Sequence, residues 1–72
     1  MIYDKERVAM RVKSLRIDKG WDQADLSRES GVSAATISNI ETARSGMGFD
    51  TAVKIANAVG CTLDKLACRD ER

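Results

Sequence analysis

The span between two helical patterns near the middle of the chain constrains the fold more than any other feature. The first pattern ends at Gly31 and the second has a capping residue at Ser33, so a single residue separates the two signals. So short a turn forces the two helices to cross steeply. The crossing needs a small side chain at the contact, which Ser27 provides, and a residue that tolerates positive φ, which Gly31 provides. Apolar anchors flank the turn at Leu26, Val32, Ile37 and Ile40.

These features predict a helix-turn-helix over residues 23–42. The alternative is an ordinary helical hairpin in a small bundle.

The rest of the chain also has helical periodicity, with no alternation long enough for a strand and no proline to break a helix. The pattern predicts an all-α fold in a single domain over residues 1–72. The five expected helices lie at about 4–19, 23–30, 34–41, 51–59 and 63–68. Candidate caps at their starts are Asp4, Asp22, Ser33, Asp50 and Thr62. The last residues, Arg69–Arg72, are expected to fray.

The composition excludes several kinds of function. The 72 residues contain no histidine and only two cysteines, so neither a histidine-based catalytic triad nor a four-ligand zinc site can form. We therefore expect no enzyme activity, no cofactor and no metal. No apolar run reaches the roughly 18 residues that span a membrane, and the N-terminal segment lacks the apolar stretch of a signal peptide. With Cys61 and Cys68 expected as reduced thiols, the sequence predicts a cytoplasmic protein without a membrane partner.

The net charge is only +1, but it is unevenly distributed. Residues 1–20 carry six basic and three acidic side chains, for +3. Residues 21–42 carry Arg28 against four acidic side chains, for −3, and residues 43–72 contribute +1. The low total weighs weakly against a strong nucleic-acid binder, and the positive charge that attracts phosphate is concentrated before the predicted helix-turn-helix.

The chain resembles the phage-repressor and Cro family of helix-turn-helix domains, also called XRE-type. The resemblance is carried by residues 11–27 (RVKSLRIDKGWDQADLS), 31–41 (GVSAATISNIE) and 54–66 (KIANAVGCTLDKL). It implies a five-helix, lambda-repressor-like domain that binds operator DNA, usually as a two-fold dimer. Two positions depart from the family: the loop 45–49 has no proline, and Ser30 replaces a small apolar residue. The first departure leaves the conformation of the loop open.

The third predicted helix has one buried side and one small, neutral side. On a helical wheel, Ile37 and Ile40 define the buried side. The outward stripe consists of Ala35, Asn39 and Thr42, with Thr36 and Ser38 on its flanks. A solvated helix face usually carries Lys or Glu, so this stripe predicts close contact with another surface, such as the floor of the DNA major groove. The alternative is a plain solvent-facing side.

Individual side chains of this helix suit contacts with bases. The amide of Asn39 can pair bidentately with adenine, and the methyl groups of Ala35 and Thr36 can contact thymine methyls. The family resemblance implies that Ser33 and Ala34 also lie near DNA, at the start of the helix. A packing role for Ala34 is an equal alternative.

Contacts to phosphate are expected beside the third predicted helix. Gln23 begins the second helix, where free N–H groups favour an anion, and it matches a glutamine that the family uses for phosphate contact. Arg44 is the only charged residue of the loop after the third helix, so it is a second candidate. For both residues the alternative is simple solvation. Weaker candidates are Arg11, Lys13 and the backbone N–H groups around Gly46 and Gly48.

Four further residues are expected to support the fold. Trp21 and Phe49 are expected in the core. The alternative for Trp21 is stacking on a base, and the alternative for Phe49 is an exposed position at a contact between subunits. Arg16 and Glu41 fall on the core-facing stripes of their helices, so we expect them to form an ion pair, as the family resemblance also implies. The alternative is that each side chain reaches water independently.

Two classes of function remain. The first is a sequence-specific transcriptional regulator, a repressor that binds double-stranded operator DNA as a homodimer through residues 33–42. Its subunits would touch near Cys61, Leu63 and Leu66, and the alternative for Leu63 and Leu66 is a place in the core. The second is an antitoxin or another protein-interaction module with a partner protein, which the −3 charge of residues 21–42 favours.

Overall fold

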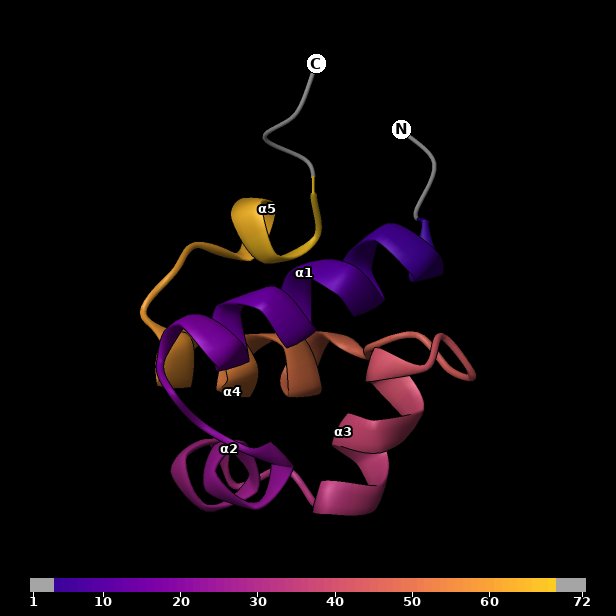
Figure 1. Ribbon diagram of the computed structural model, residues 1–72. Coiled ribbons are helices and arrows are strands. Elements are labelled where there is room, and N and C mark those ends of the chain that lie inside the picture. The colour runs from indigo at the N-terminus through magenta and orange to yellow at the C-terminus, as the bar shows by residue number, and fades with distance from the viewer. Residues whose placement is uncertain (1–3, 69–72) are drawn as a thin grey trace.

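The computed structural model describes residues 4–68, which form five helices and, within that range, no strand (Figure 1). The helices are α1 (Lys5–Asp18), α2 (Gln23–Ser30), α3 (Ala34–Glu41), α4 (Phe49–Val59) and α5 (Leu63–Leu66). The prediction of an all-α, five-helix fold is confirmed. The predicted fraying of Arg69–Arg72 concerns residues outside the described range.

Side-chain caps explain where four of the helices begin. Asp22 and Asp25 form a capping box at the start of α2: Asp22 Oδ1 accepts from the Asp25 N–H at 2.8 Å, and Asp25 Oδ2 accepts from the Asp22 N–H at 3.0 Å. The predicted caps of α1, α3 and α5 are also present, at Asp4, Ser33 and Thr62. Each accepts backbone N–H groups that the first turn would otherwise leave without a partner.

Two helix boundaries differ from the prediction by two residues, while those of α1 differ by one residue at each end. Helix α4 begins at Phe49 with Gly48 as its N-cap, and no side chain caps it, so the expectation that Asp50 caps this helix is wrong. Asp50 lies instead in the first turn, where its negative charge interacts favourably with the positive end of the helix dipole. Helix α5 ends at Leu66 rather than 68, because Cys68 adopts a left-handed φ of 61° that a helix cannot continue.

The helices enclose one aliphatic core. Helix α1 packs on α3 and α5, α2 packs on α3 and α4, and α4 packs on α5. The largest fully buried side chains are Val8, Val12, Leu26, Ile37, Ile40, Ile55 and Leu66. Trp21 is half-buried against the edge of this cluster, which agrees with its predicted packing role.

Two apolar residues lie elsewhere than expected. Phe49 is 74% exposed, so its predicted place in the core is wrong. It is the first residue of α4 and lines a surface groove with Met47 and Leu63. Leu66 is 0% exposed and belongs to the core, so it cannot form a contact between subunits as expected.

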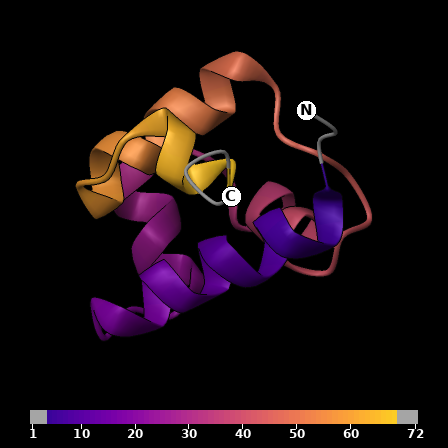
Figure 2. The same ribbon diagram turned by 90° about the horizontal axis from the view of Figure 1, so that it is seen from above.

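The helices are arranged so that α5 and α1 lie at one end of the molecule and α2 and α3 at the other (Figure 1). The view from above shows α5 lying over the space between α1 and α4 (Figure 2). The two ends of the described chain meet at this upper end, where the Cys68 thiol donates to the Arg7 carbonyl at 3.6 Å. Both Cys61 and Cys68 are free thiols.

Candidate nucleic-acid interface

The turn between α2 and α3 has the conformation that its sequence requires. Gly31 adopts a left-handed φ of 78°, and its N–H donates to the Ser27 carbonyl at 2.9 Å. Ser30, which departs from the family pattern, has a local role: its Oγ accepts the Val32 N–H at 3.1 Å. The Val32 side chain is buried, so the turn is held both by this backbone hydrogen bond and by packing of Val32 in the core.

Helix α3 divides sharply into a buried and an exposed face. Ile37 and Ile40 are 0% and 1% exposed, respectively. The exposed residues around the other face are Ser33, Ala34, Ala35, Asn39 and Thr42, while Thr36 and Ser38 are half-buried. None of these seven residues carries a charge. Ala34 is exposed, so the structure does not support a packing role for it, and its contact with DNA stays a prediction.

Most hydroxyl groups on this face are already used within the helix. Ser33 Oγ accepts the Thr36 N–H at 3.2 Å and donates to Thr36 Oγ1 at 2.8 Å. Thr42 Oγ1 donates to the Ser38 carbonyl at 2.8 Å. Asn39 differs, because its side chain makes no hydrogen bond within residues 4–68. Its amide is therefore the polar group of the stripe best placed to meet an external partner.

An ion pair connects the buried side of α3 to α1. Arg16 Nε donates to Glu41 Oε2 at 2.8 Å, and Arg16 Nη2 donates to Glu41 Oε1 at 3.0 Å. The two side chains are 12% and 3% exposed, so the predicted pair is present and largely shielded from water. Arg16 Nη1 also donates to the Trp21 carbonyl at 2.8 Å. The hydrogen bond to Glu41 raises the pKa of Arg16 above its ordinary value, so the guanidinium stays charged.

Gln23 joins the same network. Its Nε2 donates to Glu41 Oε1 at 3.2 Å, which fixes the amide at the first residue of α2. This contact is missing from the sequence-based prediction, which considers Gln23 as a phosphate ligand or as a solvated polar residue. The available signal was the short connection of residues 19–22 between α1 and α2, which keeps Gln23 close to Arg16, the expected partner of Glu41. Glu41 therefore fixes side chains from two neighbouring helices.

The loop after α3 begins with a residue in an uncommon conformation. Ala43 has a φ of 60°, the left-handed region that favours glycine. This lets the N–H of Ala43 donate to the Ile40 carbonyl and the N–H of Arg44 donate to the Asn39 carbonyl. The side chain of Arg44 is exposed. The backbone groups of the loop start are thus used to end α3, which leaves the guanidinium as the group able to reach an anion.

The basic residues of α1 do not share one direction. Arg11 Nη1 donates to the Lys65 carbonyl at 2.6 Å, so this guanidinium lies against α5, away from α3. Lys13 is exposed on the same helix. Gly46 and Gly48 are both exposed in the loop. Of the weaker phosphate candidates, Arg11 is the one whose position argues against the role.

Neither a metal site nor a membrane segment is found in the described part of the chain. Residues 4–68 contain no cluster of three potential metal ligands. Over the same residues, no helix has the length and apolar character needed to cross a membrane.

Comparison with known proteins places this arrangement in context. The HTH_3 model, described as helix-turn-helix, matches residues 12–66. Two curated relatives are each 33% identical over 58 residues, covering 81% of this chain: Antitoxin HipB from Escherichia coli O6:H1 strain CFT073 and Antitoxin HipB from Escherichia coli K12. The chain spans 62% and 66% of their lengths, respectively.

A solved structure is similar as well. It is the crystal structure of an HTH_3 family transcriptional regulator from Vibrio cholerae, with a TM-score of 0.82 and 27% sequence identity. The match covers 92% of this chain and 37% of that protein.

Proposed function

Since the chain belongs to the HTH_3 helix-turn-helix family and carries the fold of its DNA-binding regulators, we propose that it represses transcription by binding operator DNA sequence-specifically through α3. The observation that supports this most is the exposed face of α3. The side chains of that face are small and uncharged, and the Arg16–Glu41 pair on the opposite side of α3 holds the helix against α1. Small neutral side chains allow a helix to approach the floor of the major groove closely.

The side chains of this region suit distinct contacts. Asn39 would read adenine through its amide, and the methyl groups of Ala35 and Thr36 would contact thymine. Gln23 uses one amide N–H on Glu41, and a glutamine amide has two, so the second can donate to phosphate. Arg44 would contact phosphate from the loop, while Ser33, Ala34 and Ser38 would line the approach to the groove.

A pair of asparagine variants tests the proposal. Selection from a random duplex pool would first define the bound sequence. Asn39→Ala should then lose about 1–3 kcal/mol of discrimination at one base pair per half-site. Asn57→Ala is the matched control, because Asn57 is an exposed asparagine on α4, and it should leave the preference profile unchanged. An unaltered profile for Asn39→Ala would show that Asn39 does not read a base.

Binding as a homodimer is the second part of the proposal. An apolar groove of about 230 Å³ lies between the start of α4 and α5, lined partly by Met47, Phe49, Ala52 and Leu63. Phe49 at its rim is 74% exposed, and a second copy would remove this ring from water. The described part of the chain measures 31 × 23 × 20 Å. Two copies side by side could therefore place their α3 helices about 34 Å apart, one turn of DNA.

Replacing Phe49 tests this interface. Phe49→Ser should lower the apparent mass in light scattering and weaken binding to a two-half-site duplex more than binding to one half-site. Met10→Ser is the matched control, since Met10 is 73% exposed on α1, outside this groove. One protein per duplex and a single unrepeated half-site in a footprint would contradict the dimer.

Similarity to two proteins named as antitoxins favours a second candidate function. In this reading the chain also binds a partner protein. The test is co-purification with the product of an adjacent gene, in parallel with a gel shift on the chain's own upstream region. Retention of the neighbouring product would support this candidate, whereas a gel shift without any retained partner would support DNA regulation alone.

A further inference from the structure

One hydrogen bond joins a side chain suited to DNA contact to a buried carboxylate. Gln23 Nε2 donates to Glu41 Oε1 at 3.2 Å. Gln23 is the first residue of α2 and Glu41 is the last residue of α3, so the bond connects the ends of the two helices that lie away from their shared turn. Gln23 is half-buried, and its side chain makes no other hydrogen bond within residues 4–68. Its second amide N–H can therefore meet an outside acceptor.

The carboxylate determines which end of the Gln23 amide faces Glu41. A glutamine amide has a donor nitrogen and an acceptor oxygen, and rotation of the side chain exchanges their places. An ionised carboxylate only accepts hydrogen bonds, so it attracts the nitrogen and repels the oxygen. Without this acceptor the amide would sample several orientations, and only some of them present an N–H to a given phosphate. The Glu41 carboxylate therefore orders the donor before any DNA arrives.

Arg16 makes this arrangement compatible with a nearby anion. Its Nε and Nη2 donate to the two Glu41 oxygens at 2.8 and 3.0 Å, so the charges of the pair cancel. An unpaired carboxylate at this place would repel a DNA phosphate. Arg16 Nη1 also donates to the Trp21 carbonyl, two residues before Gln23. The same guanidinium thus holds the backbone that leads into α2 and the carboxylate that orients the Gln23 amide.

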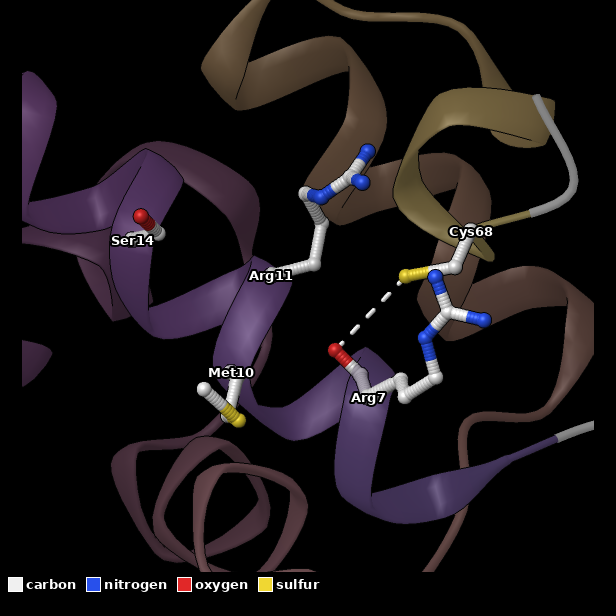
Figure 3. A pocket seen from close by; sticks show the side chains of 5 residues that line it. All are labelled: Arg7, Met10, Arg11, Ser14 and Cys68. Atoms are coloured by element: carbon white, nitrogen blue, oxygen red, sulfur yellow. Dashed lines mark hydrogen bonds between the residues drawn. The ribbon is translucent and has the colours of Figure 1, made fainter. Parts of the chain in front are cut away.

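The arginines of α1 serve different neighbours. Figure 3 shows Arg7 and Arg11 extending toward the end of α5, beside a cavity of about 250 Å³. Arg11 Nη1 donates to the Lys65 carbonyl at 2.6 Å. Arg16 instead contacts α3 and the segment before α2. Substitutions in the Arg16–Glu41 pair therefore leave these contacts between α1 and α5 in place.

We propose that Glu41, held by Arg16, is a positioning residue for DNA binding, because it orients the Gln23 amide so that the second N–H donates to a phosphate. The inference rests on the proposed DNA-binding function and adds to the role of Glu41 in holding α3. An amide that is ordered in advance avoids part of the entropic cost of binding. Phosphate contacts carry no sequence information, so loss of this positioning should weaken binding to all sequences and leave the base preference unchanged.

The test uses the full chain with the double substitution Arg16→Met and Glu41→Met, called the double-Met variant below. Replacing a buried ion pair by apolar side chains of similar volume is often neutral for stability, whereas removing one partner is costly. The net charge stays at +1, and Gln23 loses its acceptor. Urea denaturation first establishes that the variant folds. If it does not fold, Glu41→Gln takes its place, because a neutral amide at position 41 no longer favours one orientation of Gln23.

Side-chain amide signals report the order of Gln23 without DNA. The chain contains one glutamine and two asparagines, Asn39 and Asn57, so ¹⁵N spectra of the double-Met variant and of the unmodified chain each show three NH₂ pairs. The Gln23 pair should have an order parameter near about 0.85 in the unmodified chain and below about 0.6 in the double-Met variant. Asn57 is the internal control, because it is exposed on α4 and should not change.

Affinity for a selected duplex then measures the coupling to DNA. Gln23→Ala should weaken binding about tenfold in the unmodified chain, the loss expected for one hydrogen bond to a charged group. The same substitution should weaken binding less than about twofold in the double-Met variant. Arg44→Gln is the matched control for a phosphate contact, because Arg44 is exposed in the loop after α3. Its effect should be equal in both backgrounds, which a general displacement of α3 would not produce.

Several outcomes would overturn the positioning role while DNA binding itself stands. One is a Gln23 amide that stays ordered in the double-Met variant. Another is an equal loss on Gln23→Ala in both backgrounds, or no loss in either. A changed base preference in the double-Met variant would assign Glu41 to the orientation of α3 alone. An unmodified chain that binds no duplex from the random pool would instead refute the proposed function, and this inference with it.

Discussion

Among single residues, Glu41 connects three helices. Its two carboxylate oxygens accept hydrogen bonds from Arg16 and Gln23 and so join α3 to α1 and α2. The Glu41 carboxylate is 3% exposed, so burying its charge would cost much free energy without these hydrogen-bond donors. The residue does not face outward with Asn39. Its role is to hold the orientation of α3 relative to the rest of the fold.

Breaking the Arg16–Glu41 pair should therefore be costly. We expect Arg16→Met to lower the free energy of unfolding by about 3 kcal/mol, since it leaves a buried carboxylate without its charged partner. Urea denaturation of Arg16→Met, Glu41→Gln and the double variant measures the coupling. Arg28→Met is the control, because its ion pair with Asp25 is exposed at the surface and should matter little. Additive single effects in the cycle would contradict the coupling.

Ala43 has a backbone conformation that is unfavourable for alanine. It holds a φ of 60° at the end of α3, where glycine costs nothing in steric strain. Ala43→Gly should raise the free energy of unfolding by about 0.5–1 kcal/mol, because relief of left-handed strain exceeds the added freedom of the unfolded chain.

The control for this substitution is Ala24→Gly, an exposed position inside α2 with helical backbone. There the same change should lower stability by about 0.5–1 kcal/mol. Thermal unfolding of both variants gives the comparison. Changes of the same sign would refute the account of strain at Ala43.

At the scale of elements, the start of α2 depends on ionised carboxylates. The Asp22 N–H, and secondarily Arg28, hold the pKa of Asp25 below its ordinary value. A lowered folded-state pKa means that the contribution is fully present above the unfolded value, about 3.9, and is lost as the pH falls through the folded one.

Asp25→Asn should therefore destabilise the protein at pH 7, and the difference from the unmodified chain should shrink below about pH 4. Urea midpoints at both pH values provide the measurement. Asp18→Asn serves as the control, because Asp18 is an exposed carboxylate at the C-terminal end of α1, where negative charge opposes the helix dipole. A difference for Asp25→Asn that persists unchanged in acid would contradict the argument.

The helices themselves were largely predictable, because periodicity and capping residues are local signals. Four predicted caps are present, and the turn at Gly31 has the expected backbone. The predictions that failed concern residues whose burial depends on neighbouring elements and not on the sequence pattern of their own helix. Phe49 follows the apolar spacing of α4, but its side chain is 74% exposed, whereas Ala52 in the same turn packs against the core. A helical wheel shows which residues share a face and not which faces have neighbours.

The candidate site divides in the same way. The exposed stripe of α3 follows from the positions of Ile37 and Ile40, so Ala35 and Asn39 were identifiable from spacing. The hydrogen bond from Gln23 to Glu41 depends on where three helices meet, which single-helix patterns do not contain. The DNA roles of these residues remain predictions.

For the whole molecule, the placement of charge predicts how DNA binding responds to salt. Residues 21–42 carry −3, so the proposed phosphate contacts near α3 would rely partly on neutral donors such as Gln23. Each charged contact contributes about −0.9 to the slope of log affinity against log salt concentration. The slope should therefore be clearly shallower than about −10, a value for strongly basic interfaces.

Arg44→Gln should reduce the magnitude of that slope by about 0.9. Arg28→Gln, an exposed arginine already paired with Asp25, should leave it unchanged. Affinity titrations over a range of salt concentrations measure both. A steep slope in the unmodified protein would mean that charged contacts are more numerous than the structure suggests.

The two faces of α3 also bear on how such a domain can diverge. Ala35 and Asn39 are exposed and contribute nothing to the buried cluster, while Ile37, Ile40 and Glu41 hold the helix in place. Mutations can therefore accumulate on one face without eroding the stability that the other face maintains. If α3 reads DNA as proposed, a lineage that keeps the inner residues fixed can change the recognised sequence one substitution at a time, because each variant still folds.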